Sequence, residues 1–262
     1  MKYMGSKARI APFISEKINN IALCEGIKDY YEPFMGGCSV GEQVLIENKY
    51  MSDSNITIVE LFKKAQTDMF DFNYISKEEW YKIKADRFTF NTYEPWQVGW
   101  AGLACSFRGR PFSAYAGIYT DKANGKERNP QLEAYNALIS EIPLISNMKF
   151  TCCDYKDIGR PLHSIIYCDA PYRGTAQYQM VDKFNFDEYD AWLLKMAKDN
   201  LVLISEYSMI GRLSSSFELL ETWNLQSSIG SGHSDDASNM ECLYYVKNGW
   251  LTDKYFGESI DF

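Results

Sequence analysis

Five short runs of apolar or β-branched residues, each ending in polar, glycine or proline residues, most strongly limit how this chain can fold. They are Asp29–Tyr31, Tyr50–Met51, Met148–Cys152, Ser164–Cys168 and Leu201–Ser205. Such runs are typical of buried parallel strands, and functional side chains tend to follow the carboxyl ends of those strands. The sequence therefore predicts an α/β fold built on a mostly parallel sheet.

Helical patterns lie between and around these runs. They cover Ser39–Asn48, Ile56–Phe70, Asn129–Ile142 and Phe186–Asp199. The third begins with Asn-Pro, a good N-cap followed by proline at the first helical position. Near the C-terminus, Phe217–Ser227 and Met240–Lys247 flank the polar loop Gly230–Asn239 and predict an antiparallel hairpin that closes the sheet.

Residues 71–128 interrupt the alternation of strands and helices. They are rich in aromatic residues, arginine and glycine. We interpret them as an inserted, mainly helical module, with residues 1–70 and 129–262 as the main domain. A chain of 262 residues is long enough for one core of about 150–200 residues and a smaller module.

The charge balance argues against a nucleic-acid partner for the chain as a whole. The net charge is −8 and the pI is about 5.0, whereas phosphate binding needs Lys and Arg. Two segments are locally basic, because residues 1–17 and residues 75–130 each carry a net charge of +3. A local basic face on an acidic protein is therefore compatible with the sequence.

Cysteine and histidine usage argues against a metal site. The seven cysteines form no CxxC pair, and only two histidines are present. The odd number of cysteines and the lack of a secretory signal favour reduced thiols in a cytoplasm. No apolar run approaches the roughly 18–20 residues of a membrane span. We expect a cytoplasmic protein without metal or membrane segment, and either a monomer or a weak dimer.

The first strand leads into Glu32-Pro33-Phe34-Met35-Gly36-Gly37, a glycine loop that allows close approach of the backbone to a ligand. Asp53 follows 21 residues after Glu32, an offset at which an acid can accept hydrogen bonds from both ribose hydroxyls. The alternative is that Asp53 only caps the next helix. The segment Gly37–Gly41 also matches GxSxG, which would make Ser39 a hydrolase nucleophile.

The fourth strand delivers Asp169-Ala170-Pro171-Tyr172. Pro171 stiffens the turn, so that the Asp169 carboxylate and a backbone carbonyl can accept two hydrogen bonds from one exocyclic NH₂ group. The Tyr172 ring can stack on the attached base, which reaches such a turn only when it is rotated out of the duplex. The alternative is a helix N-cap with an incidental aromatic residue.

Taken in order, these motifs resemble the Dam-type family of DNA adenine-N6 methyltransferases of bacteria and phages. The segments that carry the resemblance are Lys2–Lys7, Glu32–Gly37, Ser52–Asn55, Ala104–Gly117, Asp154-Tyr155, Asp169–Tyr172 and Ser205–Tyr207. The resemblance implies a Rossmann-like class I methyltransferase sheet with a DNA-recognition insertion, S-adenosylmethionine as methyl donor and double-stranded DNA as partner. The chain departs from the family at Ala170, where proline is usual; a residue acting through its backbone carbonyl tolerates alanine in a looser turn.

The resemblance also implies roles for single residues. Lys7 would hold the methionine carboxylate of the cofactor, Asp53 its ribose and Asp154 its adenine amino group, while Asp169 and the Ala170 carbonyl would hold the target amino group. The full set of implied cofactor-binding residues is Tyr3, Lys7, Glu32, Phe34, Gly36, Gly37, Asp53, Asp154, Tyr155 and Asp169.

In the inserted module, Arg108 and Arg110 are candidates for phosphate or guanine contacts. Tyr115 or Tyr119 could fill the space left by an extruded base.

Three other readings remain open from the sequence. A hydrolase using Ser39 would need an acid and a histidine later in the chain; His233 is available, whereas His163 lies immediately before a predicted buried strand. A non-catalytic DNA-binding protein on this scaffold, or methyl transfer to RNA or to a cytosine amino group, would use the same residues differently.

Overall fold

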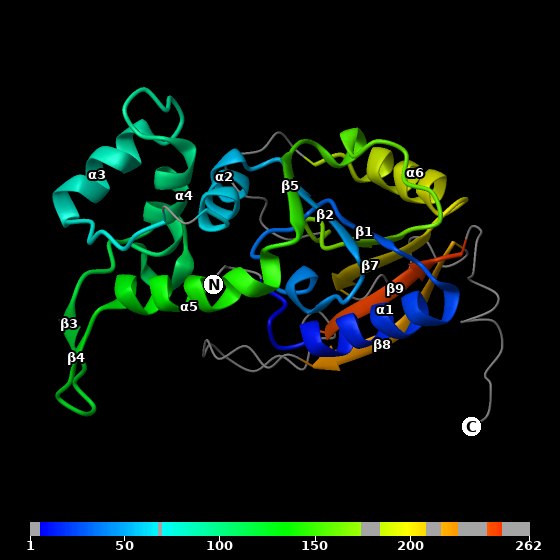
Figure 1. Cartoon of the computed structure of the whole chain (residues 1–262), viewed down its shortest axis with the longest axis horizontal. Coiled ribbons are helices and arrows are strands. Elements are labelled where there is room, and N and C mark those ends of the chain that lie inside the picture. The colour runs from blue at the N-terminus through cyan, green and yellow to red at the C-terminus, as the bar shows by residue number, and fades with distance from the viewer. Residues whose placement is uncertain (1–5, 68–69, 174–183, 208–215, 225–239, 248–262) are drawn as a thin grey trace. The chain divides into compact units, whose positions relative to one another are not determined.

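A seven-stranded sheet carries the fold of this protein, seen here in a computed structural model that describes residues 6–67, 70–173, 184–207, 216–224 and 240–247 (Figure 1). The strand order is β5-β2-β1-β6-β7-β9-β8. The strands are β1 (Asp29–Glu32), β2 (Asn48–Asp53), β5 (Met148–Cys152), β6 (Ile165–Cys168), β7 (Leu201–Tyr207), β8 (Phe217–Asn224) and β9 (Met240–Val246). Each of the five predicted core strands is therefore present.

Pairing within the sheet matches the predicted pattern. Strand β6 is parallel to both β1 and β7, whereas β9 is antiparallel to both β7 and β8. The register between β8 and β9 shifts between Leu219 and Glu221. The predicted α/β fold, a mostly parallel sheet with an antiparallel C-terminal hairpin, is confirmed.

Strand β6 and the first four residues of β7 are continuous apolar runs because both of their faces are covered. All four residues of β6 are buried, and so are the first six residues of β7. A strand that faced water on one side would alternate apolar and polar residues instead.

In the described part of the chain, four α-helices lie outside the predicted insertion: α1 (Ala11–Glu25), α2 (Ile56–Ala65), α5 (Pro130–Ile145) and α6 (Phe186–Met196). The last three begin at asparagine N-caps, where the side chains of Asn55, Asn129 and Asn185 accept main-chain N–H groups of the first turn. Helix α2 ends earlier than predicted, with Gln66 as its C-cap, and the Gln66 side-chain amide donates to the carbonyl groups of Ile145 and Met148.

The helix predicted at Ser39–Asn48 is wrong. Only a 3-10 turn, Gly41–Gln43, forms there, and Val44 is already extended. The N–H of Leu45 donates to the Asn19 side chain and that of Asn48 to the Lys28 carbonyl. Main-chain donors that a helix would need are therefore used by other partners.

Helix α1 was not predicted, although its sequence contains a signal for it. Ile14, Ile18, Ile21 and Ala22 recur at helical spacing, and all four are buried. The helix has neither acidic residues in its first turn nor basic residues in its last turn, so the usual charge signals for its ends are missing.

The chain divides into two compact units. Unit A comprises Met1–Pro12, Met35–Val44 and Met51–Tyr155; unit B comprises Phe13–Phe34, Leu45–Tyr50 and Lys156–Phe262. Each unit contains some of the predicted site residues, and each is described below by itself.

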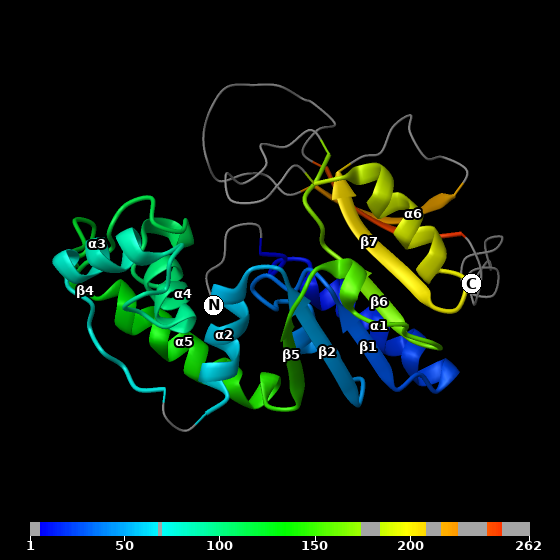
Figure 2. The same cartoon turned by 90° about the horizontal axis from the view of Figure 1, so that it is seen from above.

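Within unit A, the segment predicted as an insertion forms α3 (Lys77–Asp86), α4 (Pro95–Leu103) and the small hairpin of β3 (Tyr119–Thr120) and β4 (Glu127–Arg128). Helix α4 packs against α2 (Figure 2). Their backbones are so close at Gly99 that an added Cβ would lie 2.2 Å from the Thr57 carbonyl oxygen. The domain boundaries at residues 71 and 128 stay a prediction.

Candidate active site

The glycine loop and Asp53 form a corner of unit A at the end of β2. The N–H of Gly36 donates to Asp53 Oδ2 at 3.1 Å, and the N–H of Asn55 donates to Oδ1 at 2.9 Å. Gly36 has a φ of +43°, a left-handed conformation that a side chain would strain. Met35 also donates to the Ser52 carbonyl at 3.0 Å, so the loop is fastened to the strand end at two points.

Asp53 is held as a hydrogen-bond acceptor in partly buried surroundings. Burial raises the pKa of its carboxyl, and the N–H donors of Asn55 and Gly36 act in the opposite direction. The alternative that Asp53 caps the following helix is wrong, because Asn55 is the N-cap of α2 and accepts from Thr57. The carboxylate instead joins the glycine loop to β2.

The end of β5 approaches the same corner. The N–H of Cys153 donates to the Asp53 carbonyl at 3.1 Å, and Cys152 Sγ lies 3.8 Å from the Ser54 carbonyl oxygen. Asp154 and Tyr155 follow directly, with Asp154 partly exposed and Tyr155 buried. The structure thus brings Asp53 and the segment that holds Asp154 close together.

The N-terminal motif lies against the glycine loop in unit A. The hydroxyl groups of Ser6 and Ser39 are hydrogen-bonded at 2.7 Å. Lys7 is 8% exposed, and its carbonyl accepts the N–H groups of Ile10 and Ala11. Tyr3 lies outside the described residues.

Unit B contains the other end of the glycine motif. Glu32 is buried and accepts the Tyr30 hydroxyl at 2.7 Å. Phe34 lies edge-on to Phe184 and Tyr189, with ring centroids 6.0 and 5.7 Å away. Phe34 is therefore held by aromatic neighbours while remaining partly exposed.

The motif Asp169-Ala170-Pro171-Tyr172 follows β6 directly in unit B. Asp169 is partly exposed, Ala170 is buried and Pro171 is exposed. The Tyr172 side chain is buried, and its hydroxyl lies 3.0 Å from Asp169 Oδ1 and is hydrogen-bonded to Glu241 Oε1. The next described helix, α6, is capped by Asn185, so the reading of Asp169 as its N-cap is wrong.

Two further carboxyl groups surround this motif. Glu206 of β7 accepts the N–H groups of Arg173, at 3.3 Å, and of Tyr207, at 2.9 Å. Burial raises the pKa of Glu206 to about 7, although these two donors lower it. Glu241 of β9 is 4% exposed and touches Tyr172.

Sequence reasoning did not find Glu241. Its only signal in the sequence is that it is the one acidic residue in Met240–Val246, an otherwise apolar and aromatic run predicted to form a strand that closes the sheet. A buried acid in a strand needs a partner, and Tyr172 supplies one.

Arg173 fixes the chain after the motif. Its guanidinium group pairs with Asp190 of α6 and lies over the Phe186 ring, 4.5 Å from the centroid. These two side-chain contacts and the main-chain hydrogen bond to Glu206 fix the position of Arg173.

The residues predicted to contact DNA lie in unit A. Arg110 and Tyr119 are exposed, whereas the side chain of Arg108 lies outside the described part of the structure. The Tyr115 hydroxyl donates to the Ile75 carbonyl at 2.7 Å, and that of Tyr74 lies 2.9 Å away. Tyr115 thereby ties the end of the predicted insertion to its beginning.

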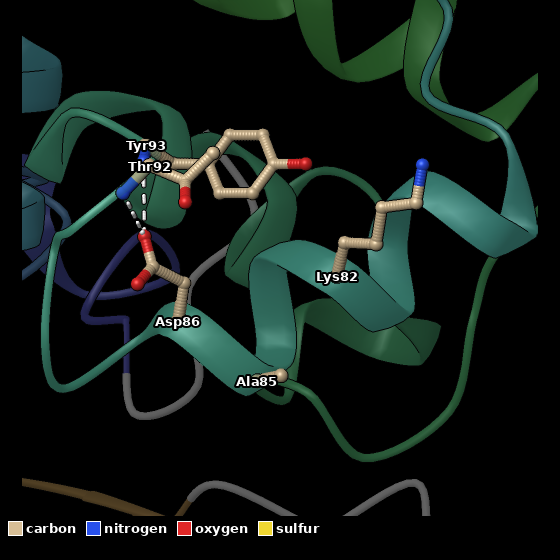
Figure 3. Close-up of a pocket in the computed structure, with 5 residues that line it drawn as sticks. All are labelled: Lys82, Ala85, Asp86, Thr92 and Tyr93. Atoms are coloured by element: carbon tan, nitrogen blue, oxygen red, sulfur yellow. Dashed lines mark hydrogen bonds between the residues drawn. The ribbon is translucent and has the colours of Figure 1, made fainter.

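A surface hollow of about 420 Å³ lies on α3 and contains none of the predicted site residues. Figure 3 shows Asp86 at its edge, where its carboxylate accepts the N–H groups of Thr92 and Tyr93, both at 2.9 Å. Together with the Thr89 hydroxyl, these donors lower the pKa of Asp86 to about 2. This carboxylate therefore organises a loop.

The geometry around Ser39 is unlike a hydrolase nucleophile. Such a serine sits on a strained turn between a strand and an α-helix, but here Cys38 has the positive φ of 62° and only a 3-10 turn follows. His233 lies outside the described residues. Among the described residues, no group of three or more His, Cys, Asp and Glu side chains could hold a metal ion, and no helix is long and apolar enough to cross a membrane.

Comparison with known proteins agrees with these motifs. Residues 3–96 match the family model described as D12 class N6 adenine-specific DNA methyltransferase. The chain is also 24% identical over 229 residues to the Type II methyltransferase M.MjaIII of Methanocaldococcus jannaschii, a match that covers 76% of this chain and 77% of that protein. The predicted resemblance is thereby confirmed, with residues 3–96 similar to the D12 class of N6 adenine-specific DNA methyltransferases.

Proposed function

We propose that this protein transfers a methyl group from S-adenosylmethionine to the N6 amino group of adenine in double-stranded DNA. The observation that carries the proposal is Asp169 at the end of a buried strand, hydrogen-bonded to Tyr172. The family match of residues 3–96 supports the same reaction.

Unit A offers groups that fit the methyl donor. Asp53 is held by two main-chain donors, and each of its oxygens can accept a further hydrogen bond from a ribose hydroxyl. Asp154 would accept from the adenine amino group, with the Tyr155 ring beside it, and Lys7 would pair with the methionine carboxylate. When bound, S-adenosylmethionine supplies a methyl group already activated by its sulfonium sulfur.

Asp169 and the Ala170 carbonyl would act on the target amine. An adenine amino nitrogen is conjugated with its ring and is a poor nucleophile. Two acceptors, one for each N–H bond, favour a more tetrahedral nitrogen whose lone pair can attack. As the new N–C bond forms, the C–S electron pair goes to sulfur, and the nitrogen then loses one proton.

Holding the reactants in line supplies much of the rate enhancement in such a reaction. Pro171 limits the motion of the turn, and the buried Ala170 keeps the backbone carbonyl that the family's usual proline would present. The substitution at this position is therefore compatible with activity. The Tyr172 ring would stack on an adenine rotated out of the duplex.

Residues 71–128 would recognise the DNA in this proposal. Arg108 and Arg110 would contact phosphates or guanine edges, and Tyr115 or Tyr119 would occupy the space left by the extruded base. The exposed positions of Arg110 and Tyr119 support this assignment. A locally basic segment on a chain of net charge −8 makes binding strongly dependent on salt concentration.

Methyl transfer can be tested with labelled S-adenosylmethionine and genomic DNA that lacks adenine methylation. We expect label in N6-methyladenine after hydrolysis to nucleosides, and methylation-aware sequencing should locate it at one short site. The Asp169→Ala variant is the matched control. Label in cytosine or only in RNA, or binding of donor and DNA without any transfer, would overturn the proposal.

A further inference from the structure

The Tyr172 hydroxyl lies between two carboxyl groups. Its oxygen is 3.0 Å from Asp169 Oδ1 and is hydrogen-bonded to Glu241 Oε1. Burial and the two acids raise the pKa of Tyr172, so the hydroxyl keeps its single hydrogen. One hydrogen cannot be donated fully to two acceptors, and the second contact is favourable only if one carboxyl group carries a proton and donates it.

Burial indicates which carboxyl group carries that proton. Glu241 is 4% exposed and is followed by five buried residues of β9, whereas Asp169 stands partly exposed at a strand end. An ionised carboxylate costs more free energy the more completely it is removed from water. The neutral form is therefore favoured at Glu241.

The charged and titratable groups around Glu241 favour the same assignment. Tyr207 of β7 lies opposite Glu241 in the strand register, and Asp169 shares the Tyr172 hydroxyl with it. Glu206 of β7 and Tyr167 of β6 interact with Glu241 electrostatically, and Glu32 of β1 interacts with Tyr167. Arg173 brings a positive charge, but its guanidinium group is paired with Asp190. A further negative charge at Glu241 would stand among other acids.

We propose that Glu241 is a positioning residue that carries a proton, donates it to the Tyr172 oxygen, and so directs the Tyr172 hydrogen to Asp169. This inference rests on the proposed function. It adds a role for Tyr172 beyond its ring and a residue that none of the site motifs contains.

The resulting chain of hydrogen bonds runs from Glu241 through Tyr172 to Asp169. It presents the Tyr172 hydrogen to Asp169 and so orients the Asp169 carboxyl group as the acceptor for the target amine. If Glu241 loses its proton, the Tyr172 hydrogen turns to Glu241, and Asp169 faces an oxygen lone pair instead of a donor. The chain consumes no proton, and the proton lost by the methylated nitrogen passes to Asp169 and leaves to solvent with the product.

Infrared spectroscopy tests the proton on Glu241 directly. At about pH 7.5 exposed carboxyl groups are ionised, so the acid carbonyl stretch reports carboxyl groups that hold a proton. We expect Glu241→Gln to remove an acid band from the spectrum of the full chain. Glu206→Gln identifies the separate contribution of Glu206, and Glu218→Gln, at a partly exposed glutamate of β8 paired with Lys247, should change nothing.

Single-turnover methyl transfer tests the positioning role. In the wild type we expect the rate to fall at high pH, where Glu241 loses its proton. The amide introduced by Glu241→Gln can donate to Tyr172 but cannot ionise. This variant should therefore keep the rate within about threefold and show no loss of rate at high pH. Glu241→Leu, whose new side chain cannot donate, should lower the rate by about 10–100-fold. Tyr172→Phe keeps the ring and should lose the same alkaline dependence.

The two measurements separate the inference from the proposed function. An acid band that survives in Glu241→Gln, or an alkaline loss of rate unchanged in that variant, would overturn the role of Glu241. An absence of methyl transfer in the wild-type chain would overturn the proposed function, while the infrared result would still decide whether Glu241 carries a proton.

Discussion

The two corners of the predicted site hold their carboxyl groups in different ways. In unit A, Asp53 stands with two main-chain N–H donors, from Gly36 and Asn55. In unit B, Asp169 and Glu241 share one tyrosine hydroxyl, with Glu206 nearby. Main-chain donors keep their hydrogens and positions, whereas a hydroxyl can rotate its hydrogen and an acid can lose one.

This difference matches the two tasks of the proposed reaction. Binding a ribose requires a fixed acceptor that does not change during turnover, and Asp53 fits that need. Acting on an amine requires an acceptor that can take up the proton released by the amine. The acidic cluster around Tyr172 contains groups whose protonation or hydrogen-bond direction can change. The predictions below test whether the corners are separable in this way.

The largest effect is expected at Asp169. Asp169→Ala removes one acceptor of the target amine and should lower single-turnover methyl transfer by about 10³-fold, comparable to losing one preorganised hydrogen-bond partner of a reacting group. Asp169→Asn should lose less, because an amide oxygen can still accept. Binding of S-adenosylmethionine by calorimetry should weaken only partly in both variants. Full activity in Asp169→Ala would contradict the role of Asp169 as an acceptor for the target amine.

At the other corner, Asp53→Ala should act on donor binding. Loss of hydrogen bonds from a charged acceptor costs about 1.5–3 kcal/mol, which corresponds to an increase of about 10–100-fold in KM for S-adenosylmethionine. The rate at saturating donor should stay within a few fold. If Asp53→Ala instead lowered the saturated rate while sparing KM, the two corners would not divide the work as described.

Folding stability should depend on pH through Glu206. Its pKa is 4.5 when unperturbed and about 7 in the fold, so between these values the folded chain binds more protons than the unfolded chain. The contribution is therefore fully present below about pH 4.5 and is lost as the pH rises through 7, by about 3 kcal/mol. Urea unfolding of the wild type and Glu206→Gln across this pH range measures the contribution. If the free energy of unfolding changed equally with pH in the two proteins, the assignment to Glu206 would be contradicted.

Much of the sheet could be predicted because apolar runs such as Ile165–Cys168 are set by burial on both faces. The Ser39–Asn48 helix was wrong because its donors are taken by partners distant in sequence, Asn19 and Lys28. Local patterns do not contain such contacts. Helix α1 was missed although its apolar spacing was present, since it lacks charged end signals.

The candidate site could be predicted where residues follow strand ends. Asp53 and Asp169 both do so, and the structure finds each one hydrogen-bonded at its strand end. Glu241 could not be found in this way, because it reaches the site only through the antiparallel pairing of β9 with β7. That pairing joins residues nearly seventy positions apart, Tyr172 and Glu241.

The smallest effect is expected next to Asp53, at the residue that does cap α2. Asn55 accepts from Thr57 N at 3.1 Å and from the Thr57 hydroxyl at 2.8 Å. Removing an asparagine cap costs about 1 kcal/mol, so Asn55→Ala should lower the free energy of unfolding by that amount. KM for S-adenosylmethionine should hardly change, because the main-chain N–H that holds Asp53 remains.

Asn55→Ala and Asp53→Ala therefore form a matched pair of neighbouring variants. Urea unfolding and donor titration of both should show one that affects mainly stability and one that affects mainly donor binding. If Asn55→Ala raised KM as much as Asp53→Ala, the cap itself would position the donor, and the fixed acceptor of unit A would be the whole turn rather than the Asp53 carboxylate.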